Sequence, residues 1–384
     1  MPHLVVSISG HGFGHVAQTA PILNLLPERM PQLQLTVRSA VPLSHLRSRI
    51  RVPFDHLPSE GDIGMVMSSA LDVRVEQSRA AYRAFHADWD ARVAGEARLL
   101  RDLGADMVFS NVGYLPLAGA QRAGIANAAL CSLNWSDIYR HYCNTDTKHT
   151  VHAELVEACM SHPSTGSGRT DDELIAAQIH SCYANADTFL RATPGMAMSD
   201  LPNLFPVAPI AAVGNDRRDE LNRHLKLSTE EKLVLVSMGG IASRLPIERW
   251  PRMDGVRWLV QENWQVAHPD AVVLESLPMS FSDLLASSDA LLCKPGYGSF
   301  VEAACSGTSV LYVDRPDWPE APALIAWMQQ HGVCREVSRG QLESGVIAQD
   351  LSWLWSVPKT VAPMPDGAAQ VADWLMGRLS LSGD

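Results

Sequence analysis

The chain has 384 residues, of which 46% are hydrophobic and 19% are charged, and its net charge is −11 at neutral pH. This length exceeds that of one typical domain, so we expect two domains with ample apolar residues for their cores. The negative charge argues against a general affinity for nucleic acids or anionic membranes, although a few local cations can still hold an anionic nucleotide.

The compartment can also be predicted from the sequence. Seven cysteines are scattered without a C-x-x-C spacing, which is typical of buried thiols rather than of disulfides or a metal site. The opening residues, MPHLVVSISGHG, lack the charged start and the long apolar run of a signal peptide, and no run approaches the roughly 18 apolar residues of a membrane span. We therefore expect a cytoplasmic protein without an integral membrane span, for which peripheral membrane contact stays open.

Short apolar runs alternate with helical stretches in the first half of the chain. This alternation predicts a parallel α/β sheet. Strands are expected at 4–9, 33–37, 107–110 and 126–133, and helices at 15–26, 80–103, 115–123 and 171–185. Residues 152–170 combine a short helical piece with a Ser/Gly/Pro-rich piece, which indicates an exposed, functionally neutral insertion.

A segment with two prolines and no clear periodicity, 203–215, is expected to link the two domains. A second α/β unit follows, with strands at 232–237, 257–260, 271–274, 290–293 and 309–313 and helices at 283–288 and 366–379. The predicted domains are 1–205 and 216–365, followed by a C-terminal segment, 366–384.

The first glycine-rich loop is Gly10-His11-Gly12-Phe13-Gly14, directly after the first strand. Its spacing is G-x-G-x-G rather than the G-x-G-x-x-G of dinucleotide-binding folds, and the second strand ends in Arg38-Ser39 without an acidic residue for a ribose. An NAD site is therefore disfavoured, while Arg38 leaves an NADP site open. A metal site at His11 and His15 is disfavoured because no further ligand lies nearby in the sequence.

The second glycine-rich loop is Lys294-Pro295-Gly296-Tyr297-Gly298, between an apolar strand and a short helix. Glycines allow a ligand to approach the backbone, and a helix N-terminus favours a phosphate or diphosphate. Gly239 and Gly240 follow another strand and offer further N–H groups for a diphosphate, or form a plain tight turn. Ser299-x-x-Glu302 also reads as a capping box, with Glu302 in the first helical turn.

This second segment resembles the nucleotide-sugar-binding segment of GT-B glycosyltransferases, and in particular the glycosyltransferase-like N-terminal half of plant L-arabinokinases. The resemblance rests on the loop from Lys294 to Ser299, on Glu302, and on Arg315 and Glu320 after the next strand. It implies two Rossmann-like domains with parallel sheets facing across a cleft, with the C-terminal helix crossing back to the first domain. It also implies that Glu302 binds the nucleotide ribose and that Glu320, and less specifically Arg315, contacts the donor sugar.

Gly14-His15-Val16 is similar to the Gly-His-Val that follows the first strand in GT-B enzymes. The resemblance makes His15 the base that deprotonates the acceptor, with His11 as the alternative; either could equally be a histidine that only hydrogen-bonds the loop. Since open α/β sheets bind ligands at the carboxyl ends of their strands, this cleft is expected to include the residues that follow them there. These residues are Gly12, Phe13, Gly14, Asn111, Asn134 and Trp135.

Asn111 departs from the GT-B pattern, because an Asp is expected at that position as the partner of the catalytic histidine. The resemblance implies a metal-independent, inverting transferase that uses a nucleotide sugar as substrate, an unknown acceptor and no cofactor. The alternatives are a nucleotide-sugar epimerase or hydrolase, and a non-catalytic nucleotide-sugar-binding protein, which Asn111 makes a real option.

The one D-x-D motif, Asp88-Trp89-Asp90, lies in a helical stretch and does not indicate a metal-dependent enzyme.

Overall fold

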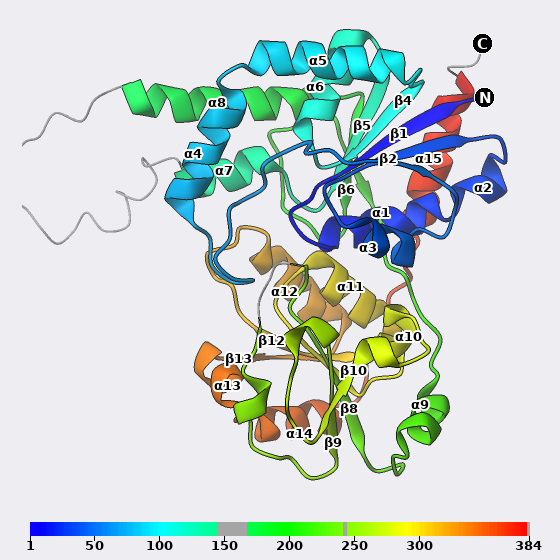
Figure 1. Ribbon diagram of the computed structural model, residues 1–384, viewed down its shortest axis with the longest axis vertical. Helices are drawn as coiled ribbons and strands as arrows, with labels where there is room; N and C mark the ends of the chain where they lie inside the picture. The colour runs from blue at the N-terminus through cyan, green and yellow to red at the C-terminus, as the bar shows by residue number, and fades with distance from the viewer. Residues whose placement is uncertain (144–166, 241–243, 382–384) are drawn as a thin grey trace, which may run out of the picture.

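The computed structural model describes residues 1–143, 167–240 and 244–381, which form two α/β units, one above the other in Figure 1. Each unit is built on a sheet whose strands all pair in parallel. Strands such as β1 and β11 are buried along their whole length, because helices cover both faces of a parallel sheet. The predicted α/β class with two parallel sheets is confirmed.

The first sheet has seven strands within the described residues, in the order β3-β2-β1-β4-β5-β6-β7. Its strands are β1 (His3–Ile8), β2 (Gln34–Arg38), β3 (Asp55–Leu57), β4 (Met107–Asn111), β5 (Ala126–Cys131), β6 (Thr188–Ala192) and β7 (Leu204–Val207). Its helices are α1 (Gly14–Leu23), α2 (Leu26–Arg29), α3 (Leu43–Arg49), α4 (Val75–His86), α5 (Trp89–Asp102), α6 (Tyr114–Ala123), α7 (Trp135–Cys143) and α8 (Ser167–Ala184).

The second sheet has six strands within the described residues, in the order β10-β9-β8-β11-β12-β13. Its strands are β8 (Lys232–Ser237), β9 (Val256–Val260), β10 (Ala271–Val273), β11 (Ala290–Cys293), β12 (Ser309–Val313) and β13 (Cys334–Val337). The helices that follow β7 are α9 (Arg218–Leu225), α10 (Phe281–Ala286), α11 (Tyr297–Ser306), α12 (Ala321–His331), α13 (Arg339–Ser344), α14 (Ala348–Ser356) and α15 (Gly367–Leu381).

Two expectations about the elements need correction. The single helix expected at 80–103 is two helices, α4 and α5, because the first packs on α7 and α8 while the second packs on α6. Part of the expected linker, Leu204–Val207, is the edge strand β7, where a proline is tolerated because its missing N–H faces no partner strand. The expected insertion lies outside the described residues, except for its last four, which begin α8.

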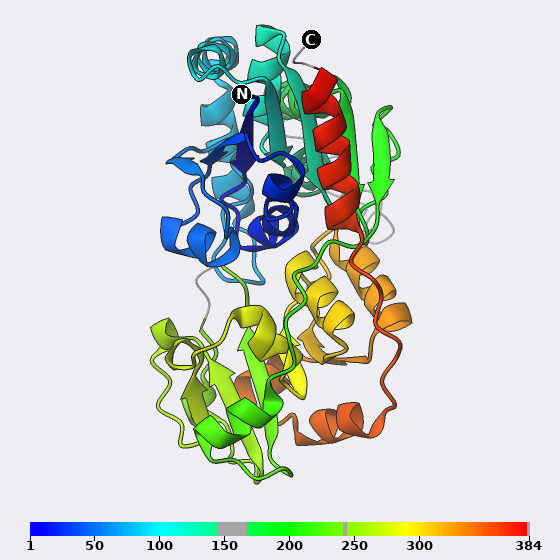
Figure 2. The same ribbon diagram turned by 90° about the vertical axis from the view of Figure 1, so that its right-hand side faces the viewer.

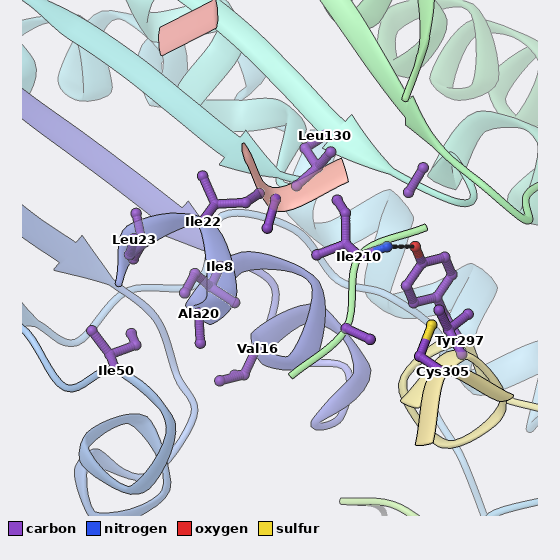
Figure 3. Close-up of a cluster of buried hydrophobic side chains, with 14 of the residues drawn as sticks. Ile8, Val16, Ala20, Ile22, Leu23, Ile50, Leu130, Ile210, Tyr297 and Cys305 are labelled. Atoms are coloured by element: carbon purple, nitrogen blue, oxygen red, sulfur yellow. Dashed lines mark hydrogen bonds between the residues drawn. The ribbon is translucent and has the colours of Figure 1, made fainter. Parts of the chain in front are cut away.

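The two units share one hydrophobic core. A single cluster of buried side chains runs from the first sheet through α1 and α11 to the second sheet. Figure 3 shows part of it, including Val16 and Ala20 on α1 and Tyr297 and Cys305 on α11. The C-terminal helix α15 contacts α1, α2 and β7 of the first unit, and Figure 2 shows the chain rising from the second unit to reach it.

Candidate functional site

His15 and Asn111 meet at the carboxyl end of the first sheet. Asn111 ends β4, next to Ile8 at the end of β1, and His15 lies in the first turn of α1. The Nδ1 of His15 lies 2.9 Å from the Oδ1 of Asn111. Because that amide oxygen can only accept, Nδ1 carries the proton and Nε2 is left as the basic nitrogen. Burial lowers the pKa of His15 to about 4, and the bond to Asn111 offsets only part of that effect.

A chain of buried polar side chains leads from this pair into the second unit. Asn111 Nδ2 donates to Gln18 Oε1 at 3.1 Å, and Gln18 Nε2 donates to Ser132 Oγ at 2.8 Å. Ser132 Oγ in turn donates to Glu320 Oε1 at 2.5 Å. His15 is thus connected to a carboxyl group through three side chains, rather than through direct contact with an aspartate.

His11 is held as an aromatic side chain between two tryptophans. Its ring lies edge-on to Trp135, with centroids 5.0 Å apart, and stacked on Trp318 at 5.8 Å. Its Nδ1 accepts a hydrogen bond from the backbone N–H of Met65 at 3.2 Å. Burial lowers the pKa of His11 well below its usual value, and the proximity of His15, Lys294 and Arg315 adds to this effect. Since Nδ1 is occupied as an acceptor, His11 is less suited than His15 to take a proton from a substrate.

Two cations of the second unit lie close to His11. Lys294, at the end of β11, is half-buried, and burial together with the charge of Arg315 lowers its pKa to about 7. The guanidinium of Arg315 lies 4.0 Å from the ring centroid of Trp318, and its Nη2 lies 3.7 Å from the Sδ of Met67. Its buried Nε has no hydrogen-bond partner, and burial lowers the pKa of Arg315 to about 10. Two neighbouring cations, one of them with an unpartnered buried Nε, are suited to an anionic ligand.

Glu320 is the acidic group at the same place. It accepts hydrogen bonds from Ser132 and from Trp318 Nε1, the latter at 3.1 Å. Burial raises the pKa of its carboxyl group, while these two donors and the charges of Lys294 and Arg315 lower it. The site therefore joins groups from both units around the first turn of α1 and the loop after β12.

The start of α11 makes contacts that the sequence does not predict. The Tyr297 hydroxyl accepts from the backbone N–H of Ile210 and donates to the carbonyl of Thr193, both at 3.0 Å, and Figure 3 shows the first of these bonds. A Cβ built on Gly298 would lie 2.8 Å from that of Ala17 on α1. Tyr297 and Gly298 thus hold the two units together at the end of the helix where a ligand was expected. Gly296 precedes the helix as its N-cap, and Ser299 is half-buried in the first turn.

Glu302 lies in the second turn of α11 rather than the first, and the capping-box interpretation is wrong. The helix begins at Tyr297 after Gly296, and no side chain caps it. Glu302 is instead buried and forms an ion pair with Arg49 at the end of α3. Burial raises the pKa of Glu302, and the pairing with Arg49 opposes that rise.

The remaining candidate residues shape the junction between the units. Phe13 stacks on His45 with ring centroids 3.6 Å apart, and its ring occupies the space that a Cβ on Gly240 would need. Gly12 and Gly239 have positive φ angles of 116° and 82°, which explains why glycine stands at both positions. Gly14 is exposed, and nothing lies within 4 Å of a Cβ built there.

Asn134 and Trp135 have different roles. Asn134 Oδ1 accepts from the backbone N–H of Asp137 at 2.8 Å, so Asn134 caps the start of α7. Trp135 is fully buried between the two histidines, with its ring 5.0 Å from His11 and 5.9 Å from His15.

Sequence reasoning did not identify several residues of this site. Asp62 lies in the loop after β3, where Ser9 Oγ donates to its Oδ1 at 2.9 Å and burial raises its pKa to about 6. Gln18, Ser132 and Trp318 were missed as well. Ser132 directly follows β5, and its position at the carboxyl end of a strand could have identified it as a site residue. Gln18 lies inside a helix, and nothing in the sequence marks it as a site residue.

No protein-family model matches the chain. It is 23% identical over 352 residues to an L-arabinokinase of Arabidopsis thaliana, covering 89% of this chain and 31% of that protein. The chain therefore spans about a third of the length of the curated relative it matches.

Solved structures resemble the whole chain. The calicheamicin glycosyltransferase CalG4 superposes with a TM-score of 0.58 at 14% identity, covering all of both chains. UGT89C1 of Arabidopsis thaliana, in complex with UDP, superposes with a TM-score of 0.54 at 14% identity, covering 99% of this chain and all of the other. The chain has the GT-B glycosyltransferase fold. The resemblance found in the sequence is confirmed at the level of the fold.

Among the described residues, no three His, Cys, Asp or Glu side chains gather where they could bind a metal ion. Likewise, none of the described helices is both long and apolar enough to span a bilayer.

Proposed function

We propose that this protein is a glycosyltransferase that moves a sugar from a nucleoside diphosphate sugar to an acceptor hydroxyl, with inversion and without a metal ion. The observation that carries the proposal is the placement of His15. Its Nδ1 is bound to Asn111, so its Nε2 can act as a base, and the neighbouring His11 lies within the electrostatic influence of Lys294 and Arg315 of the second unit. The GT-B fold, shared with glycosyltransferases such as CalG4 and UGT89C1, supports the same conclusion.

The donor diphosphate is proposed to bind at the second unit. Lys294, Arg315 and the first N–H groups of α11 supply positive charge there, and helix N-termini favour phosphate groups. Gly239 lies close to this place, because a Cβ built there would be 3.5 Å from the Lys294 side chain, and the N–H of the adjacent Gly240 is proposed to contribute as well. Glu302 is proposed to reach the ribose, which requires that Arg49 share or release its carboxylate.

The reaction follows from these positions. His15 Nε2 takes the proton of the acceptor hydroxyl while that oxygen attacks the anomeric carbon. The bond from this carbon to the diphosphate oxygen breaks, and the nucleoside diphosphate leaves with the electron pair. Lys294 and Arg315 then stabilise its growing negative charge. A single displacement from the opposite face inverts the anomeric configuration.

A non-catalytic nucleotide-sugar-binding protein remains the second candidate, and one observation favours it. An aspartate beside a catalytic histidine stabilises the charged imidazole, and the neutral Asn111 does so less well. Burial also lowers the pKa of His15 to about 4, which makes it a weak base. An epimerase or hydrolase would use the same donor site without an acceptor.

The test is a His15→Ala variant assayed with a panel of labelled UDP-sugars and hydroxylated acceptors. We expect turnover to fall by about 10²–10⁴-fold while UDP affinity stays unchanged, since the base acts only on the acceptor. The matched control is His224→Ala, an exposed histidine on α9, which should keep full activity, and EDTA should cause no loss. Wild-type turnover by His15→Ala would contradict the assignment. UDP-sugar binding without turnover by any pair would favour the binding protein, and acceptor-free conversion the epimerase or hydrolase.

A further inference from the structure

The polar chain from His15 to Glu320 has a direction. Trp318 Nε1 can only donate, so Glu320 Oε2 accepts from it, and Glu320 Oε1 accepts from the Ser132 hydroxyl. With its proton directed at Glu320, Ser132 Oγ can only accept from Gln18, which fixes the Gln18 amide nitrogen on that side. Every donor in the chain thus points towards the second unit.

The same logic continues to the histidine. With its nitrogen turned to Ser132, Gln18 presents its Oε1 to Asn111, which must present its Nδ2 in return. Asn111 Oδ1 is then the atom that meets His15 Nδ1, so this nitrogen must carry the proton. The oxygen and the nitrogen of a side-chain amide are similar in shape, so shape alone does not determine which of them faces a given neighbour. The donors and acceptors around the amide determine it.

We propose that Glu320 fixes, through Ser132, Gln18 and Asn111, which ring nitrogen of His15 carries the proton. The catalytic meaning of this positioning role rests on the proposed function, since only the Nδ1–H form leaves Nε2 free as a base. Glu320 then supplies from the other unit the carboxylate that is missing beside His15. The final link, from Ser132 to Glu320, crosses between the two units, so the base is fully oriented only while the units are in contact.

Burial makes this chain effective. All five of its members are at most 6% exposed, so water competes little for their hydrogen bonds. One further contact favours the same orientation of Asn111, because its Nδ2 also lies 3.4 Å from the carbonyl oxygen of His15. This contact is longer than the bond to Gln18, so breaking the chain is expected to redistribute the two tautomers rather than to invert them.

The experiment observes the His15 ring nitrogens by NMR in the full-length protein labelled with ¹⁵N-histidine, at a pH where His15 is neutral. Ser132→Ala and Gln18→Met each break the chain while leaving Glu320 in place. Trp318→Phe is the matched control, because it removes the other hydrogen bond of Glu320 and keeps the bond to Ser132. His15→Ala assigns the signal.

We expect His15 to be largely Nδ1–H in the wild type and in Trp318→Phe, and mixed in Ser132→Ala and Gln18→Met. Asn111→Asp should restore the Nδ1–H form to Ser132→Ala, since a carboxylate beside His15 needs no distant partner. In an active enzyme, kcat should follow the Nδ1–H population, so equal populations would lower it about twofold.

An unchanged tautomer in both Ser132→Ala and Gln18→Met, or the same change in Trp318→Phe, would overturn the proposal. The readout needs no substrate, so failure of the proposed transferase activity would leave this result standing on its own.

Discussion

At the scale of single residues, burial sets the chemistry of the site more than sequence neighbours do. The pKa values of Lys294 and Arg315 are lowered by desolvation, and the charge of Arg315 adds to the effect at Lys294, whereas burial lowers the pKa of His15 and the bond to Asn111 offsets only part of that effect. The binding of a charged ligand is therefore expected to change the pKa values of these groups. A diphosphate would offset the repulsion between the two cations and stabilise their charged forms.

This arrangement predicts proton uptake when UDP binds. With a pKa of about 7, Lys294 is largely neutral at about pH 8 in the free protein, and a bound diphosphate raises that pKa. Calorimetry of UDP binding in two buffers with different ionisation enthalpies should show uptake of close to one proton at about pH 8. Lys294→Met should bind UDP more weakly and without uptake. Equal uptake by this variant would contradict the role of Lys294.

At the scale of elements, the N-terminal ends of α1 and α11 determine how closely the units approach. Glycines stand where the other unit leaves no space: Gly298 faces Ala17, and Gly240 faces the Phe13 ring. In the sequence these glycines indicate a loop that a phosphate can approach, whereas in the structure another part of the chain approaches them. Both roles need the same missing side chain, so the sequence pattern alone cannot separate them.

Gly298→Ala should therefore destabilise the protein. Its Cβ would lie 2.8 Å from that of Ala17, and overpacking of this kind costs about 1–3 kcal/mol, of which helix propensity returns up to about 1 kcal/mol. Gly377→Ala on α15 is the matched control, because nothing lies within 4 Å of its Cβ, and it should stabilise by about 0.5–1 kcal/mol. Urea unfolding measures both. Ala17→Gly should rescue Gly298→Ala, and equal stability of the two alanine variants would exclude the proposed crowding.

At the scale of the whole molecule, the two units are joined by more than the chain connections. The segment between β3 and α4 reaches the second unit, where Ala70 is fully buried among its core side chains. The Tyr297 hydroxyl forms hydrogen bonds with the backbone of both Thr193 and Ile210. The Arg49–Glu302 ion pair links α3 to α11. Only part of this interface is apolar, so pH and charge should affect its stability.

Arg49→Met should destabilise the protein by about 3 kcal/mol at about pH 7.5, because it leaves Glu302 buried without its partner. Loss of Arg49 raises the pKa of Glu302 further above its unfolded value, so the destabilisation grows as pH rises and shrinks towards pH 5. The double variant Arg49→Met with Glu302→Gln should recover much of the loss. Arg29→Met is the control, since its exposed pair with Asp373 contributes at most about 1 kcal/mol. A pH-independent loss, or one no larger than that of Arg29→Met, would contradict this account.

The local pattern of the sequence determined most of the strands, the two glycine-rich loops and the class of fold, but it missed β3, β6, β7 and β13. Apolar runs such as those of β1, β8 and β11 are fully or almost fully buried. Strands that are buried on both faces are typical of a parallel sheet covered by helices. The prediction of a single helix at 80–103 was wrong because the local pattern does not show which elements a helix packs against. Its periodicity shows an amphipathic face, but only packing decides that α4 and α5 cover different partners.

The tertiary structure decided the candidate site. The resemblance to GT-B enzymes paired position 111 with His15 in advance, and the parallel strands do bring the two residues to one edge of the sheet. The link to Ser132 and Glu320, the pairing of Glu302 with Arg49 and the burial that lowers the pKa of Lys294 depend on residues far apart in the chain. Local pattern reports the hydrophobicity and backbone needs of one segment, whereas charge and hydrogen bonding at a junction depend on which two segments meet there.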